Sequence, residues 1–135
     1  MVSEGGEVGR TAIWNEEIDE CYIQNSVHKV TILPKHNPLY FLYMFEAFGL
    51  SGYFESIASR VSIGHLTREK LKEVNCIVPS LPEQTAIANF LDKATSKIDK
   101  TIQRIEKKIE LLEEYKKSLI HHVVTGKVDV RGVKA

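Results

Sequence analysis

Apolar side chains recur at mostly alternating steps of four and three residues between Leu81 and about Thr125. This spacing places one apolar stripe along an α-helix, because the side chains return to the same face of the helix. The residues that form this apolar stripe are Ile87, Leu91, Ala94, Ile98, Ile102, Ile105, Ile109, Leu112 and Leu119. Since an apolar stripe of this length is unfavourable in water, the pattern predicts a partner helix.

Both ends of the predicted helix carry local signals. Ser80 and Glu83 form a Ser-x-x-Glu capping box, and Pro82 lies in the first turn, where its missing N–H breaks no intrahelical bond. Gly126 ends the helix. At ~1.5 Å per residue, a helix from residue 81 to about 124 is about 65 Å long.

Charged side chains flank the apolar stripe and are sorted by sign. The acidic flank is formed by Asp92, Asp99, Glu106, Glu110 and Glu113, and the basic flank by Lys93, Lys97, Lys100, Arg104 and Lys107. A solvated helix surface also carries charges, but the sorting by sign favours a role in orienting the partner helix.

The residues before the long helix predict a small mixed α/β head, residues 1–80. Strand-like patterns cover residues 8–14, 21–24, 27–33 and 74–78, whereas residues 51–64 fit either a strand or irregular backbone. The chain therefore reads as α+β, with the head, a long helix over 81–125 and a tail over 126–135 that is extended or a short strand.

Two shorter helices are predicted within the head. The first runs from residue 38 to about 48, with Asn37 as its cap, Pro38 at its first position and Gly49 as its stop. It is apolar nearly all round and too short to cross a bilayer, so we expect it to be the core helix of the head. The second covers residues 67–73, with Thr67 as its cap.

Composition narrows the possible functions. The chain has 18 basic and 18 acidic residues, so net charge gives no argument for general nucleic-acid binding, and any contact with DNA must be local. Cys21 and Cys76 lack zinc-site spacing and are predicted to be buried, reduced thiols. No apolar run of ~18 residues and no signal peptide is present, which favours a cytoplasmic protein without a membrane span.

The sequence contains no residue pattern that is typical of an enzyme active site. It contains no set of nucleophile, base and orienting residue, no metal-ligand cluster and no phosphate-binding glycine loop with its lysine. We therefore expect no catalytic residues, no cofactor and no metal.

Several motifs, in order along the chain, resemble a known family. They are IVPSLPEQTAI at 77–87, FLD at 90–92, KID at 97–99, IELL at 109–112, YKK at 115–117, LI at 119–120 and VTGKVDVR at 124–131. These motifs are similar to the end of a target recognition domain and the spacer helix of specificity subunits of type I restriction-modification systems. Residues 6–13, 22–24 and 63–71 resemble the second half of the same domain. The resemblance covers about residues 5–132.

The resemblance implies a non-catalytic, DNA-binding component of a system that defends against foreign DNA. In the family, each recognition domain reads half of a bipartite double-stranded DNA site, and two antiparallel spacer helices set the distance between the halves and dock the methyltransferase subunits. Members have two recognition domains and two spacer helices, whereas this chain has one helix and about half a domain. The resemblance therefore implies either a truncated gene product or a shortened fragment.

The natural completion is a homodimer, in which the long helix forms an antiparallel coiled coil with a second copy. Such a half-length or truncated specificity subunit would direct methyltransferase and restriction subunits to DNA. The alternative is a coiled-coil interaction module, which dimerises and binds the methyltransferase without reading DNA.

Side chains suited to phosphate or base contact are scattered over the head. The candidates are Arg10, Gln24, Arg60, His65, Arg68, Lys70 and Lys72. Arg10 and Arg68 lie in motifs of the resemblance. Each basic candidate could instead be a solvated surface charge, Gln24 a strand-end amide and His65 a structural histidine.

Overall fold

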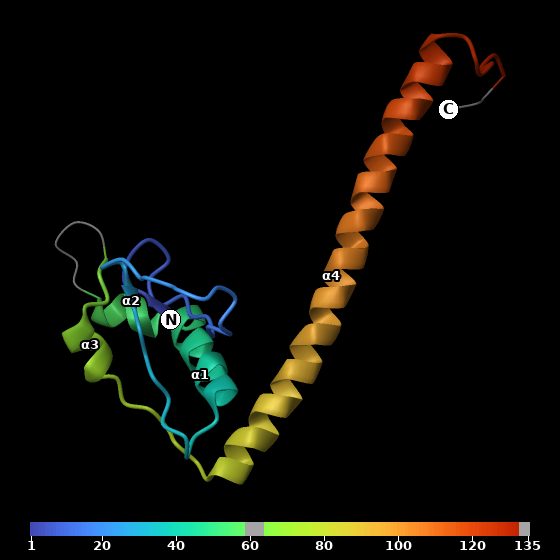
Figure 1. The fold of residues 1–135 in the computed structure, drawn as a ribbon. Coiled ribbons are helices and arrows are strands. Elements are labelled where there is room, and N and C mark those ends of the chain that lie inside the picture. Colours follow the sequence, from blue (N-terminus) through green and yellow to red (C-terminus); the bar gives the residue numbers. More distant parts are fainter. Residues whose placement is uncertain (59–63, 133–135) are drawn as a thin grey trace. The chain divides into compact units, whose positions relative to one another are not determined.

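The computed structural model describes residues 1–58 and 64–132 (Figure 1). The chain divides into two compact units, Met1–Asp92 and Lys93–Ala135. The elements are β1 (Val2–Ser3), β2 (Val27–His28), α1 (Pro38–Leu50), α2 (Tyr53–Ile57), α3 (Arg68–Lys72) and α4 (Leu81–Val124). A small sheet with helices, ending in one long helix, confirms the predicted mixed architecture. The predicted boundary at residue 80 stays a prediction.

The described residues contain much less strand than predicted. β1 and β2 pair antiparallel, with Val2 opposite His28, and Val2 also forms an isolated bridge with Thr11. Residues 8–14 are otherwise irregular, 27–33 reduce to β2, and 21–24 and 74–78 form no strand. Residues 10–12 do bond to residues 1–3, as where Ser3 N–H donates to the Arg10 carbonyl oxygen, but a turn in which Arg10 N–H donates to the Glu7 carbonyl oxygen ends this pairing.

The core of the first unit is small and aromatic. Its buried members are Val2, Phe45, Phe54 and Leu66. The Phe54 ring meets the rings of Phe45 and Phe48 edge-on, with centroids 5.7 and 5.6 Å apart. Two of the five large core side chains named here, Phe45 and Phe48, come from α1, which supports the expectation that this helix forms the core of the head.

Helix α1 begins as predicted and ends later than predicted. The Asn37 side chain accepts hydrogen bonds from Leu39 N–H at 2.9 Å and Tyr40 N–H at 3.3 Å, which confirms the cap. The predicted stop at Gly49 is wrong, because Ser51 N–H continues the helical pattern to the Ala47 carbonyl oxygen. The left-handed turn falls at Gly52, with φ of 73°.

The two remaining short helices, α2 and α3, lie between α1 and α4 in the chain. Residues 51–64 were expected to be strand or irregular, but Tyr53–Ile57 form α2. Thr67 caps α3 as predicted, since its hydroxyl accepts from Lys70 N–H at 3.4 Å.

Helix α4 has the predicted bounds. At its start, the Glu83 carboxylate accepts hydrogen bonds from the Ser80 hydroxyl at 2.6 Å and the Ser80 N–H at 3.0 Å. These bonds lower the pKa of Glu83, the hydroxyl contributing most. The bond from the Ser80 N–H is one half of the capping box. The other half would need the Ser80 hydroxyl to accept from the Glu83 N–H, whereas it donates to the Glu83 carboxylate. At the other end, Gly126 is left-handed with φ of 73°, and the described part of the tail forms turns and no strand.

Most of the apolar stripe faces solvent in the single chain. From Ile98 to Leu119 its side chains are 44–59% exposed, whereas Leu91 and Ala94 are half-buried. The stripe therefore has the predicted position on the helix, and its partner helix stays a prediction.

The cysteines depart from expectation. Both are free thiols, but Cys21 is exposed and the prediction of its burial is wrong. It lies in a loosely packed segment, in which Ile18 is 58% and Tyr22 87% exposed. Cys76 is half-buried, and burial raises the pKa of its thiol.

Gln84, in the first turns of α4, is the one polar side chain buried among the described residues. Its Oε1 accepts from Asn37 N–H at 2.9 Å, and its Nε2 donates to the Pro79 carbonyl oxygen at 2.8 Å. Gln84 thereby ties the start of α4 to the turn before α1. Its side chain therefore braces the first turns of α4 against the turn before α1.

Replacing Gln84 with leucine is expected to destabilise the first unit by about 2 kcal/mol, because it leaves a backbone donor and a backbone acceptor without partners. Urea unfolding followed by far-ultraviolet circular dichroism measures the change in free energy. The matched control is Gln103→Leu, on an exposed turn of α4. Equal unfolding midpoints for the two variants would contradict this role of Gln84.

Candidate nucleic-acid interface

Helix α3 displays three of the predicted DNA-binding residues on a short, capped support. Arg68 and Lys72 are four residues apart, which puts them on the same face, and Lys70 lies on another. All three are exposed. Leu71, between them in the sequence, is half-buried and packs against the core of the first unit. The core contact and the Thr67 cap together fix the helix that carries these cations.

A groove of about 520 Å³ lies between α3 and the segment that begins with β2. We call it the basic groove; it is lined by Val27, His28, Lys29, Val30, Thr31, Phe45, Arg68, Leu71 and Lys72. No carboxylate is among these described lining residues. Three flexible cations around an apolar floor suit an anion such as a backbone phosphate.

Lys29 is the groove cation that was not predicted from the sequence. It stands in the β-branched run of residues 27–33, which was predicted only as a strand. The signal that could have identified it is that a lysine stands within an otherwise largely apolar, β-branched run. Its nearness to Arg68 and Lys72 could not be inferred, because that depends on how two distant segments pack.

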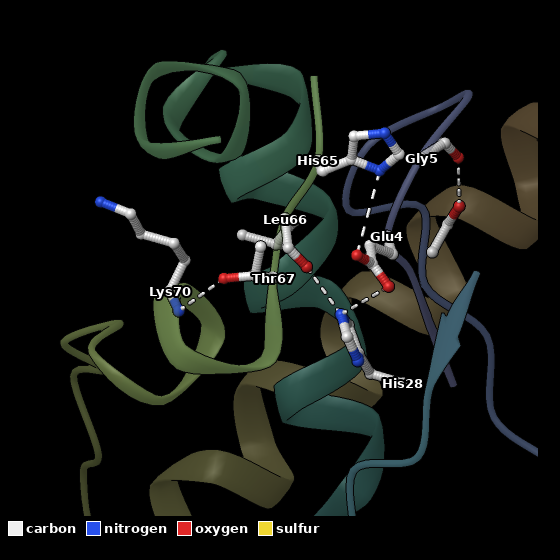
Figure 2. Close-up of polar contacts among 8 residues, drawn as sticks. Glu4, Gly5, His28, His65, Leu66, Thr67 and Lys70 are labelled. Carbon is white, nitrogen blue, oxygen red and sulfur yellow. Dashed lines mark hydrogen bonds and ion pairs between the residues drawn. The ribbon is translucent and has the colours of Figure 1, made fainter. Parts of the chain in front are cut away.

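A hydrogen-bond network joins the two sides of the groove (Figure 2). Leu66 N–H donates to the Glu4 carbonyl oxygen at 2.8 Å, and His28 Nε2 lies 2.6 Å from the Leu66 carbonyl oxygen. The Glu4 carboxylate lies 3.9 Å from both His28 Nε2 and His65 Nδ1. Glu4 N–H donates to the Ser26 carbonyl oxygen, which brings the residue before β2 into the network.

One carboxylate affects the cations of α3. The pKa of Glu69 is lowered, first by its own backbone N–H, then by the Thr67 side chain, and to a smaller extent by Lys72 and Arg68. Glu69 is therefore ionised beside two of the groove cations and competes with phosphate for them.

The remaining candidates are not brought together with α3. Arg10 pairs with Glu7 at 2.8 Å and lines a different groove, which also contains Glu46 and Glu55. Those carboxylates disfavour phosphate. His65 is half-exposed beside Glu4, Gln24 is exposed, and Arg60 lies outside the described residues.

The described residues contain no group of three or more His, Cys, Asp or Glu side chains placed to hold a metal ion. Among their helices, none combines the length and apolar character needed to cross a membrane.

The sequence is similar to those of known proteins. Residues 1–111 match the model of the type I restriction modification DNA specificity domain. The chain is also 29% identical over 132 residues to the type I restriction enzyme EcoBI specificity subunit of Escherichia coli, covering 95% of this chain and 26% of that subunit. It thus spans about a quarter of that relative's length. No solved structure matches. Because the family model covers most of its residues, the chain belongs to the type I restriction-modification DNA specificity domain family.

Proposed function

We propose that this chain is a non-catalytic specificity component of a type I restriction-modification system, in half-length or truncated form. It directs methyltransferase and restriction subunits to one half of a bipartite DNA site. The observation that carries the proposal is the basic groove, in which Lys29, Arg68 and Lys72 line one surface of a domain of this family.

The groove gives the proposal a physical basis despite the zero net charge. Lysine binds a phosphate as a point charge and arginine can bind phosphate or guanine in a bidentate manner. Phosphate contacts position a protein on the duplex, whereas contacts with base edges give specificity. We assign the groove to the positioning role.

The exposed apolar stripe supports the second part of the proposal. A second copy of the chain would cover the stripe in an antiparallel coiled coil and supply the second recognition domain that a bipartite site needs. The opposite signs of the flanking charges favour an ordered pairing of the two helices.

The alternative is an interaction module that dimerises and binds the methyltransferase without reading DNA. The exposed stripe favours it as much as the first proposal, so the two differ only over DNA. Selection from a randomised duplex library, with and without a methyltransferase subunit, separates them. An enriched sequence under either condition supports the specificity component, and none under both supports the interaction module.

Removing a groove cation should weaken DNA binding similarly for all sequences. For Lys29→Gln and for Lys72→Gln, we expect the slope of log affinity against log salt to fall by about one, because each lysine releases counterions from one phosphate. Fluorescence anisotropy with a randomised-sequence duplex measures the slope.

The control is Lys35→Gln, an exposed lysine of the same unit that does not line the groove. It should keep the wild-type slope. If all three variants keep that slope, the groove does not bind phosphate.

A further inference from the structure

Leu66 is the residue at which α3 is attached to the rest of the first unit. It is fully buried and directly precedes the Thr67 cap, two positions before Arg68. Its N–H and carbonyl groups both make hydrogen bonds to residues distant in the sequence, Glu4 and His28. Both backbone groups are therefore fixed, and the start of the helix with them.

We propose that His28 is a positioning residue for the basic groove, holding Lys29 on one side and Arg68 and Lys72 on the other at a fixed separation. The proposal rests on the proposed function in that it treats the groove as a phosphate site. His28 directly precedes Lys29, so one side-chain hydrogen bond connects the two sides (Figure 2).

The hydrogen bond between His28 Nε2 and the Leu66 carbonyl oxygen requires a particular protonation of the imidazole. A carbonyl oxygen only accepts, so His28 Nε2 must carry the proton that it donates to Leu66. Both the neutral Nε2–H tautomer and the imidazolium meet this requirement, so the bond needs a proton on that nitrogen and no net charge. At 2.6 Å it is short, whereas the Glu4 carboxylate at 3.9 Å is beyond hydrogen-bond distance.

Burial makes the bond hard to replace with water. The His28 side chain is 15% exposed, and the Leu66 side chain is fully buried. A leucine at position 28 would fill similar space but leave the Leu66 carbonyl oxygen without its donor. The segment that carries α3 would then move outward to reach water, and the groove would widen.

The test compares His28→Leu, His28→Gln and His28→Asn, with His121→Leu on α4 as the control. Glutamine places an amide N–H about where Nε2 stands, whereas asparagine is too short to reach. Two properties are measured: the salt slope of binding to a randomised-sequence duplex, and hydrogen exchange of the α3 amides without DNA.

For His28→Leu we expect an affinity loss of about tenfold, a smaller salt slope and faster exchange in α3 with unchanged protection in α1. His28→Gln and His121→Leu should stay within about twofold of wild type, a change of under half a kcal/mol. Rescue by glutamine is the result that a merely space-filling role for histidine does not produce.

Three results would overturn the proposal. They are a wild-type slope and wild-type exchange in His28→Leu, an equal loss in His28→Gln and His28→Leu, or, if the leucine variant does not fold, equal binding by the glutamine and asparagine variants. Wild-type protein that shows no salt-dependent binding, either alone or with a methyltransferase subunit, would instead refute the proposed function, and the exchange measurement would still decide whether His28 holds α3.

Discussion

Replacing Ile102 with aspartate is expected to convert a dimer into a monomer. Ile102 lies near the midpoint of α4 and is 46% exposed in the single chain. In the proposed antiparallel pair, the two copies of this residue meet near the two-fold axis. Two unpaired carboxylates would then enter an apolar seam, which we expect to weaken association by about 4 kcal/mol, or roughly a thousandfold.

Sedimentation equilibrium at micromolar concentration measures this change, from a mass of twice 15.3 kDa to a mass of 15.3 kDa. The matched control is Gln103→Asp, one residue further on and away from the apolar stripe, which should remain dimeric. If the wild-type protein is a monomer, the proposed homodimer is wrong. If the Ile102→Asp protein remains a dimer, the interface does not include the centre of the apolar stripe.

Replacing Gly9 with alanine is expected to unfold much of the first unit. Gly9 has φ of +79°, and a Cβ atom there would lie 2.1 Å from Cδ2 and 2.8 Å from Cγ of the Phe54 ring. That ring is fully buried and contacts the rings of Phe45 and Phe48 edge-on, so it cannot move aside without disturbing the core. We expect a loss of about 3 kcal/mol or more, from overpacking together with backbone strain.

Thermal unfolding followed by near-ultraviolet circular dichroism should show this as a fall in melting temperature of about 15 °C for a unit of this size. Gly6→Ala is the control, because Gly6 has nearly the same backbone, with φ of +71°, but no heavy atom within 4 Å of the added Cβ. It should cost about 1 kcal/mol. Equal effects in the two variants would mean that Phe54 moves aside.

Elements defined by local signals could be predicted from the sequence. The Asn37 and Thr67 caps and both ends of α4 follow from residues within a few positions of one another, so no knowledge of distant packing was needed. The strands could not be predicted in the same way, because a strand needs a partner. β-branched runs such as residues 27–33 show only that a strand is possible.

The residues of the candidate site likewise fall into those that local sequence predicts and those that depend on distant packing. Arg68 and Lys72 were predicted because their side chains suit phosphate or base contact, and Arg68 also lies in a motif of the resemblance. Lys29 and His28 were not, because their role depends on a contact that spans 38 residues of sequence. Cys21 was misjudged for a related reason: an apolar run predicts burial only if some other element covers it.

The buried Gln84 has a consequence for the order of events during synthesis. Asn37 and Pro79 are made before Gln84, and the bond from Gln84 to Asn37 spans 47 residues. A nascent chain that has emerged only as far as Ser80 therefore still lacks the partner for these two backbone groups. The first unit can complete its folding only after the first turns of α4 have left the ribosome.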